Sequence, residues 1–348
     1  MTRDMIRCIH IGYGGIARGM IRNLQSRPWY ATAAVVDVRP AALEQAKQEN
    51  HLPDSALFAD PAEALHQVQA DVVFINTPSE LHYAQARAAI EAGRHVLVAK
   101  PITNDFGQAA ELVRLARAAG VKLAVGQQIR YNRHYQAVRR FIESGRLGSV
   151  EFAYLLNSKP RPDPLNLKDM SQPALYEMSC HHFDSLLALL PDAVPESIVA
   201  DGFRPSWSRY TGPCMVYALI RLSGGLHVLY HGGFSSQGPL YELRLEGSRG
   251  ALRCRGLHMS NDTMTYAVAE PGGCFRDEPV DDGIPARNPF DRFFDIWHEW
   301  LQGGAEPPFS GRNNLKVFAM LSAAIDSLQC GQTVRIADNP GYKAAFVQ

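Results

Sequence analysis

The strongest constraint on the fold of this chain is a short apolar run that breaks into glycines and then continues as a helical pattern. Residues 6–11 read Ile-Arg-Cys-Ile-His-Ile, and residues 12–17 read Gly-Tyr-Gly-Gly-Ile-Ala. Gly12 can take a tight turn off a strand, Gly14 lets backbone N–H groups approach a pyrophosphate, and Ala17 is small enough for close packing of helix on sheet. Phosphates would lie at the positive end of this helix. The pattern predicts a nucleotide-binding turn, with contacts from Gly12, Gly14, Gly15 and Ile16.

A second apolar run supports this interpretation. Residues 33–36 end in Asp37, twenty residues after Ala17. A carboxylate at that spacing is expected to accept hydrogen bonds from the adenosine ribose hydroxyls and to repel the 2′-phosphate of NADP, which favours NAD. Arg39 could lie over the adenine or tolerate that phosphate, so NADP stays an alternative. Together the two runs predict a Rossmann fold that binds NAD with the help of Asp37 and Arg39.

Length and charge limit the class of protein. The 348 residues exceed what one core usually holds, so we expect two domains. The 35 basic and 35 acidic residues give zero formal net charge without a basic run, which argues against nucleic acid and membrane partners and favours a small-molecule ligand. Six cysteines without a C-x-x-C pair predict neither disulfides nor structural zinc. We find no signal peptide and no membrane span, so a cytoplasmic location is expected.

The first third of the chain alternates short apolar runs with helical patterns. The expected strands are residues 6–11, 35–38, 72–75, 96–98 and 123–125. Apolar strands that alternate with helices predict a doubly wound parallel sheet, with ligands at the carboxyl ends of the strands. We therefore assign residues 1–126 to an NAD(P)-binding Rossmann domain of the α/β class.

The pattern changes near residue 127. The expected strands now follow one another, at residues 150–157, 197–203, 215–222, 226–230 and 240–246. The expected helices are residues 135–144, 179–190, 289–301 and 313–329. This succession predicts a second, antiparallel α+β domain over residues 127–348.

Two of these runs also predict self-association. Residues 215–222 and 226–230 are apolar at most positions, so both faces of the sheet need cover. The helices of the domain can cover only one face, and a partner sheet would cover the other. We expect a homodimer or homotetramer.

Later motifs resemble a known family. Residues 76–82 read Asn-Thr-Pro-Ser-Glu-Leu-His, and residues 92–101 read Ala-Gly-Arg-His-Val-Leu-Val-Ala-Lys-Pro. Together with the Gly-Arg-Leu-Gly of residues 145–148 and His181-x-x-Asp184, they resemble the glucose–fructose oxidoreductase, inositol dehydrogenase and rhizopine-catabolism (Gfo/Idh/MocA) family. The resemblance covers nearly the whole chain. It implies a Rossmann domain, a C-terminal domain with a large, mostly antiparallel sheet, and a sugar, polyol or related hydroxyl compound as substrate.

The resemblance carries roles onto particular residues. Lys100 matches a lysine that approaches both nicotinamide and substrate hydroxyl, and His181 matches an acid/base histidine. Ser79 and Ala99 depart from the family pattern, because relatives have asparagine and glutamate there. In the histidine motif Glu177 replaces an aspartate, whereas Asp184 is kept. The motif residues implied to contact the cofactor are Thr77, Pro78, His82, Lys100 and Pro101.

Oxidation of a secondary alcohol needs a base in hydrogen-bond reach of its O–H group. Glu177, His181 and Asp184 lie at helical spacing i, i+4 and i+7, so they share one helix face. His181 would act as the base and Glu177 would orient and stabilise its imidazole. His182 points about 100° away and is expected to pack. Because adjacent helical side chains diverge, we predict no metal at Cys180-His181-His182.

The sequence identifies a class of substrate but not a compound. The substrate is expected between the two domains, in contact with Lys100, Arg161, Asp184 and His181. Arg161 lies in a polar loop, residues 159–172, but a loop that is simply exposed to solvent would have the same polar composition. We predict an NAD(H)-dependent dehydrogenase or reductase acting on CH–OH groups of a sugar, polyol or sugar acid. The alternatives are a hydrolase or epimerase that retains NAD, and a non-catalytic NAD-binding regulator.

Overall fold

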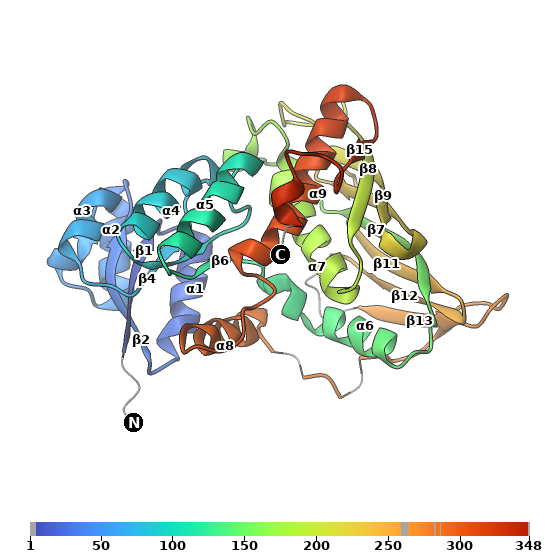
Figure 1. Cartoon of the computed structure of the whole chain (residues 1–348), viewed down its shortest axis with the longest axis horizontal. Helices are drawn as coiled ribbons and strands as arrows, with labels where there is room; N and C mark the ends of the chain where they lie inside the picture. The colour runs from blue at the N-terminus through green and yellow to red at the C-terminus, as the bar shows by residue number, and fades with distance from the viewer. Residues whose placement is uncertain (1–4, 259–263, 282, 286, 347–348) are drawn as a thin grey trace. The chain divides into compact units, whose positions relative to one another are not determined.

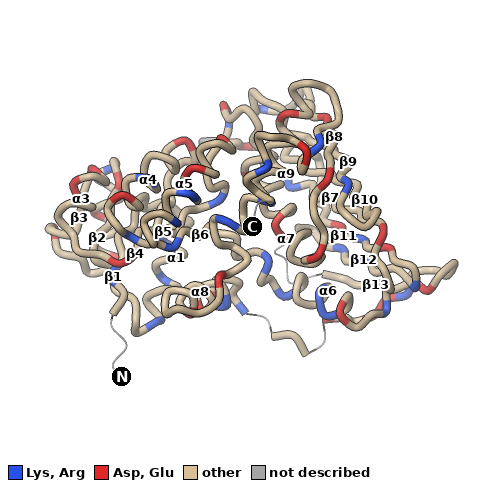
Figure 2. Tube along the Cα trace, in the orientation of Figure 1, with Lys and Arg blue, Asp and Glu red and all other residues tan. Residues whose placement is uncertain are grey.

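A computed structural model describes residues 5–258, 264–281, 283–285 and 287–346. The chain divides into two compact units, which we describe separately. Unit 1 comprises Met1–Gln127 with Phe290–Leu315, and unit 2 comprises Gln128–Pro289 with Lys316–Gln348. Acidic and basic residues are interspersed along both units (Figure 2). Within the described residues, no helix is long and apolar enough to cross a membrane.

Unit 1 contains a parallel sheet, as the sequence predicts. Its described strands are β1 (Ile6–Ile11), β2 (Tyr30–Val36), β3 (Leu57–Phe58), β4 (Val72–Ile75), β5 (His95–Val98) and β6 (Leu123–Val125), in the order β3-β2-β1-β4-β5-β6. Strands β1, β2, β4 and β6 are labelled in Figure 1. Every residue of β4 is buried, because both faces of the sheet are covered. The strand order reverses between β1 and β4, and sheets of this topology bind their ligands at the carboxyl ends of the two strands at such a point.

Helices connect these strands. They are α1 (Gly15–Gln25), α2 (Pro40–Asn50), α3 (Pro61–Gln67), α4 (His82–Glu91) and α5 (Phe106–Ala118). Local sequence explains several of their starts. Pro40 and Pro61 stand in the first turns of α2 and α3, where a missing N–H has no cost. Asp105 caps α5 by accepting a hydrogen bond from the Gln108 amide at 2.8 Å.

A late segment returns to unit 1. Helix α8 (Pro289–Leu301) buries Phe293, Phe294 and Trp297, and Phe294 lies 6.2 Å from Phe74 of β4, centroid to centroid. The first segment of unit 1 ends at Gln127, one residue after the predicted boundary, and unit 1 also includes residues 290–315, which the prediction placed in the second domain. The amphipathic pattern of α8 predicted a buried face without identifying the core that would receive it.

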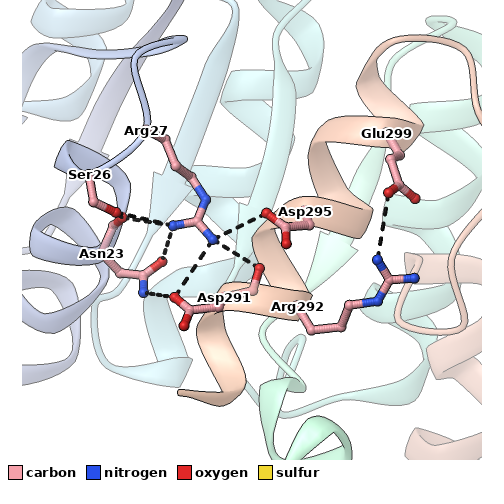
Figure 3. Close-up of polar contacts among 7 residues, drawn as sticks. All are labelled: Asn23, Ser26, Arg27, Asp291, Arg292, Asp295 and Glu299. Atoms are coloured by element: carbon pink, nitrogen blue, oxygen red, sulfur yellow. Dashed lines mark hydrogen bonds and ion pairs between the residues drawn. The ribbon is translucent and has the colours of Figure 1, made fainter. Parts of the chain in front are cut away.

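Arg27 fixes α8 to the end of α1 (Figure 3). Its guanidinium, although only 7% exposed as a residue, donates to the Asn23 carbonyl and side chain, each at 2.9 Å, and to the Asp291 carbonyl at 2.9 Å. It also contacts Asp295 at 3.3 Å. A buried charge needs several such partners, so this cluster specifies where α8 docks.

Unit 2 contains the predicted large, mostly antiparallel sheet. Its nine described strands are β7 (Val150–Ser158), β8 (Pro195–Phe203), β9 (Met215–Leu222), β10 (Leu226–Gly233), β11 (Leu240–Gly247), β12 (Gly250–Gly256), β13 (Thr265–Ala269), β14 (Arg276–Asp277) and β15 (Val334–Arg335). Only β7 and β10 pair in parallel among these strands. On β9 buried residues alternate with exposed ones, including Tyr217 and Leu219, so the described residues leave its outward face exposed.

The described helices of unit 2 are α6 (Arg133–Glu143), α7 (Cys180–Leu189) and most of α9 (Gly311–Cys330), which begins in unit 1. The start of α7 differs from the expected helix over 179–190. A π-helical turn, Leu175–Ser179, leads directly into it. The α-helical rotation of 100° per residue, on which the expected shared face of Glu177 and His181 rests, therefore applies only from Cys180 onward. π-Turns of this kind occur frequently at functional sites.

Candidate functional site

The glycine turn after β1 has the geometry of a phosphate site. Gly12 has a φ of +88°, and a Cβ there would lie 2.7 Å from the Asn76 carbonyl oxygen, so only glycine fits. A Cβ at Gly14 or Gly15 would meet nothing within 4 Å. Gly14 is the N-cap of α1 and supplies no side-chain cap to its first amides. The turn thus leaves open space and unsatisfied donors where a pyrophosphate would bind, and it fits a dinucleotide. Ile16 is 62% exposed beside it.

Asp37 follows β2 at the expected place, but its carboxylate already has partners. It accepts hydrogen bonds from the Tyr13 amide at 2.8 Å and from Arg39, whose amide, Nε and Nη2 each lie at 2.9 Å. Burial alone would raise the pKa of Asp37, but these donors outweigh it and leave the pKa below its ordinary value. The carboxylate stays ionised, and ribose hydroxyls would share it with Arg39.

Tyr13 is a site residue that the sequence did not reveal. Its ring is 2% exposed and packs with Ile21 and Val35. Its hydroxyl donates to Glu49 at 2.9 Å and accepts from Asn50 at 2.7 Å. The residue between the first two glycines therefore anchors the turn to the end of α2. No local pattern could predict these contacts, because both partners lie more than thirty positions away.

His82 joins the loops that follow β4 and β5. It is 1% exposed, and its Nδ1 and Nε2 lie 2.8 Å and 2.9 Å from the carbonyl oxygens of Pro101 and Thr77. This geometry corrects the predicted direct contact with the cofactor, because both ring nitrogens face backbone. Burial lowers the pKa of His82, so the neutral ring can donate to only one carbonyl at a time. His82 therefore contacts the backbone just before Pro78 and just after Lys100.

His181 and Glu177 occupy the start of the α7 region in unit 2. Glu177 lies in the π-turn and is partly exposed, whereas His181 lies in the first turn of α7 and is 9% exposed. Because Glu177 precedes α7 in the π-turn, the shared helix face expected for Glu177 and His181 stays a prediction. Their assigned chemistry remains a proposal.

His182 packs, as the sequence predicts, within a buried chain of hydrogen bonds. The Asn157 amide donates to His182 Nε2 at 2.9 Å, so Nδ1 carries the proton and donates to the Tyr230 hydroxyl at 2.8 Å. Tyr230 can then donate to Ser179 Oγ at 2.6 Å, and Ser179 to the Ala174 carbonyl at 3.1 Å. Burial, with smaller effects of Lys159 and His231, lowers the pKa of His182 to about 3. The neutral chain fixes the backbone next to His181.

Asp184 has a different role from the predicted substrate contact. Its side chain is 1% exposed, and Arg130 donates to both carboxylate oxygens, from Nε at 2.9 Å and from Nη2 at 2.5 Å. This bidentate pair uses the whole carboxylate. The expectation that Asp184 binds substrate is therefore corrected, and Asp184 anchors α7 to the turn Gln128–Tyr131.

Arg161 lies just beyond β7, where its amide donates to the Phe234 carbonyl at 2.8 Å and its guanidinium lies 4.7 Å from the centroid of the Phe234 ring. Within the described ranges, no group of three or more His, Cys, Asp or Glu side chains could hold a metal ion.

Comparisons with known proteins agree with this geometry. Residues 6–127 match the Gfo/Idh/MocA family model for an oxidoreductase family with an NAD-binding Rossmann fold, and residues 135–253 match a model of the C-terminal domain of that family. 1,5-Anhydro-D-fructose reductase of Ensifer adhaerens is 26% identical over 271 residues, which cover 76% of this chain and 80% of that protein. The scyllo-inositol 2-dehydrogenase (NADP⁺) of Bacillus subtilis is 24% identical over 317 residues, covering 84% and 86%.

A solved structure shares the fold. The WlbA dehydrogenase from Bordetella pertussis, in complex with NADH and UDP-GlcNAcA, has a TM-score of 0.81 at 24% identity and covers 95% of this chain and 98% of that chain.

Proposed function

Because this chain belongs to the Gfo/Idh/MocA family of oxidoreductases, with an NAD-binding Rossmann domain, we propose that it transfers hydride between nicotinamide and a hydroxyl or keto group of a sugar, polyol or sugar acid. The observation that carries the proposal is the glycine turn with Asp37, in a chain that also retains Lys100 and His181. The relatives named as a sugar reductase and an inositol dehydrogenase support the substrate class.

The residues of unit 1 would hold the dinucleotide. Amides from Gly14 to Ile16 would bind the pyrophosphate, and Asp37 with Arg39 would bind the adenosine ribose. The loops that contain Thr77, Pro78 and Pro101 would border the nicotinamide. When bound, the nicotinamide accepts or supplies the hydride.

Lys100 would bind the reacting oxygen. It follows β5 at the carboxyl edge of the parallel sheet and is partly exposed. Its ammonium would donate a hydrogen bond to the substrate oxygen, on which negative charge develops when the O–H proton leaves before the C–H hydride. Ala99 brings no carboxylate beside this lysine.

His181 would move the proton. In alcohol oxidation an imidazole nitrogen of His181 would accept the hydroxyl proton, and in ketone reduction it would return it. Glu177, one turn earlier, would stabilise the imidazolium and orient the ring. The Asn157–His182–Tyr230–Ser179 chain stays neutral and would hold α7 in place without taking part in proton transfer.

The test is a panel of polyols, aldoses and sugar acids with NAD and with NADP, in which formation of reduced nicotinamide is followed by absorbance. Oxidation of at least one compound that depends on His181 and Lys100 is expected. Turnover without net reduction, by protein that retains NAD through purification, would instead favour the hydrolase or epimerase. Cofactor binding without any turnover would favour the regulator.

We also propose a homodimer or homotetramer. Phe203, Tyr217 and Leu219 are 46%, 44% and 57% exposed on adjacent strands β8 and β9. An apolar sheet face of this kind usually receives a partner. Light scattering at micromolar concentration should give at least twice the chain mass, and Leu219→Glu should lower that mass. A monomer mass for the unmodified chain would rule out the assembly.

A further inference from the structure

A second polar cluster of unit 2 surrounds Phe234, just after β10. The Tyr210 ring stacks on Phe234 at 5.8 Å between centroids, with an interplanar angle of 18°. The guanidinium of Arg161 lies 4.7 Å from the same ring centroid. Phe234 therefore contacts both the Tyr210 ring and the Arg161 guanidinium, although these residues lie almost fifty positions apart in sequence, and Arg161 is close enough to act electrostatically on the Tyr210 hydroxyl.

The Tyr210 hydroxyl is the unusual member of this cluster. Tyr210 is 2% exposed, yet its oxygen has no hydrogen-bond partner among the described residues. A buried hydroxyl without a partner costs free energy, so such an atom commonly marks a site that something else completes. Burial raises the pKa of Tyr210 to about 12, even though the charge of Arg161 acts in the opposite direction. The hydroxyl keeps its proton and can donate it to an acceptor.

Arg161 is the second donor. Within the described parts of the chain, no carboxylate forms an ion pair with its guanidinium, and stacking on Phe234 orients the planar fork. Lys159 lies two residues earlier and is close enough to His182 to lower the pKa of that ring. Two cationic residues and a hydroxyl donor therefore lie where β7 ends.

We propose that Arg161 and Tyr210 form an anion-binding subsite in unit 2 that holds a carboxylate of the substrate. The subsite rests on the proposed function, because it selects sugar acids within the wider class of sugars, polyols and sugar acids. An Arg fork matches the two oxygens of a carboxylate, and the Tyr210 hydroxyl supplies a further hydrogen bond.

The choice of a carboxylate over a phosphate follows from the surrounding charges. Glu177 and Asp163 both act on Tyr210 from within electrostatic range and raise its pKa. Because these two negative groups lie in the same electrostatic environment as Arg161, each further negative charge on a ligand adds repulsion from them. A monoanion fits this environment better than a dianion.

The test measures binding rather than turnover. D-gluconate, D-glucitol and D-glucitol 6-phosphate are titrated calorimetrically into the full chain saturated with NADH, which prevents oxidation. The unmodified chain should bind gluconate more tightly than glucitol or glucitol phosphate. Arg161→Gln should weaken gluconate binding by about 10- to 100-fold and Tyr210→Phe by about 3- to 10-fold, whereas both leave glucitol unchanged.

Two controls keep the result interpretable. Arg139→Gln removes the same charge from an exposed i, i+4 pair of unit 2 and should not change gluconate binding. Arg161→Lys keeps the charge but loses the fork, so it should give an intermediate loss. Thermal unfolding of each variant verifies the fold.

Several results would overturn the subsite. These are unchanged gluconate affinity in Arg161→Gln, tighter binding of the phosphate than of the acid, or no saturable gluconate binding below about 10 mM. Its failure is distinguishable from failure of the proposed function. Hydride transfer by the unmodified chain together with unchanged gluconate affinity in Arg161→Gln removes only the subsite, whereas Arg161-dependent gluconate binding without any hydride transfer removes only the reaction.

Discussion

In unit 1 the candidate site combines a glycine turn and contacts to backbone groups with a few side-chain pairs, whereas in unit 2 it is held mainly by contacts between side chains. Around β1 and β4, the Gly12 amide bonds to the Val36 carbonyl at 2.7 Å, and both nitrogens of His82 face carbonyls. Around α7, the contacts are Asn157 to His182, His182 to Tyr230, and Arg130 to Asp184. Backbone sites depend on turn shape, which short motifs encode. Side-chain sites depend on residues far apart in sequence.

The largest expected effect separates the two units by function. His181→Ala should lower kcat/KM by about 10²- to 10⁴-fold and leave NAD affinity nearly unchanged, because His181 would act on the substrate proton. Lys100→Ala should impair both turnover and NAD affinity. Steady-state kinetics and NADH fluorescence titration measure the two quantities. Full activity of His181→Ala on the true substrate would make the histidine structural and move the acid/base role to Lys100.

The glycine turn offers a matched pair within unit 1. Gly12→Ala places a Cβ at positive φ and 2.7 Å from the Asn76 carbonyl oxygen, so the free energy of unfolding should fall by about 2–4 kcal/mol. Gly14→Ala meets nothing within 4 Å and should leave stability unchanged while weakening NAD binding. Thermal unfolding with and without NAD measures both effects. Equal stability of the two variants would show that the backbone geometry at Gly12 does not control the stability of unit 1.

Two buried histidines test how far side-chain contacts stabilise unit 2. His134 and His182 have pKa values lowered to about 3, for His134 by burial alone. Between pH 6.5 and 3 the unfolded chain binds protons that the folded chain does not, so stability falls as pH falls, by roughly 1.4 kcal/mol per pH unit for each ring. No hydrogen bond to His134 exists within the described residues.

His134→Phe should therefore remove one acid-sensitive group without breaking a contact, and should be about 2 kcal/mol more stable than the unmodified chain at pH 5. His182→Phe removes the same proton site but breaks the bonds to Asn157 and Tyr230, so it should lose about 1–3 kcal/mol at pH 7.5. Urea unfolding at pH 5 and at pH 7.5 measures the free energy of unfolding of each variant. Identical pH slopes for His134→Phe and the unmodified chain would contradict the assignment.

The smallest expected effect concerns cofactor choice. Arg39 is 62% exposed at its side chain and neutralises Asp37. Arg39→Ala should lower NADP affinity by about 5- to 10-fold and leave NAD affinity nearly unchanged, because the uncovered carboxylate repels a 2′-phosphate and solvent screens part of the effect. Arg87→Ala, which removes an exposed ion pair on α4, serves as the control. A rise in NADP affinity would contradict this role.

Much of unit 1 follows directly from local sequence. The Gly-Tyr-Gly-Gly-Ile-Ala turn, Asp37 and the buried strands predicted the parallel sheet and the place of the nucleotide, since each depends on residues close together in the chain. The sequence also shows the motif that includes His82, but it does not reveal which atoms the His82 ring contacts. Which atoms a buried ring faces depends on two separate loops, so the assigned cofactor contact needed correction.

Local sequence also identified the strands of unit 2 from β7 to β11 and the packing of His182. It did not identify Arg130 as the partner of Asp184, because the two residues lie 54 positions apart. It did not identify Phe234 as the ring that both Tyr210 and Arg161 contact, because these residues come from separate segments. Nor did it place α8, because the apolar face of the helix does not identify its core, whereas the ion pairs of Arg27 with Asp291 and Asp295 do.

The sequence by itself determined the class of fold and the nucleotide turn, because glycine, proline and apolar periodicity act over a few residues. Lys100 and His181 became candidates through the resemblance of their motifs to those of the family. Only the tertiary structure decided that Asp184 is buried against Arg130, that His82 faces backbone, and that residues 290–315 belong to unit 1. Those outcomes depend on which distant groups satisfy a buried charge or donor. That requirement is met only when the chain has folded.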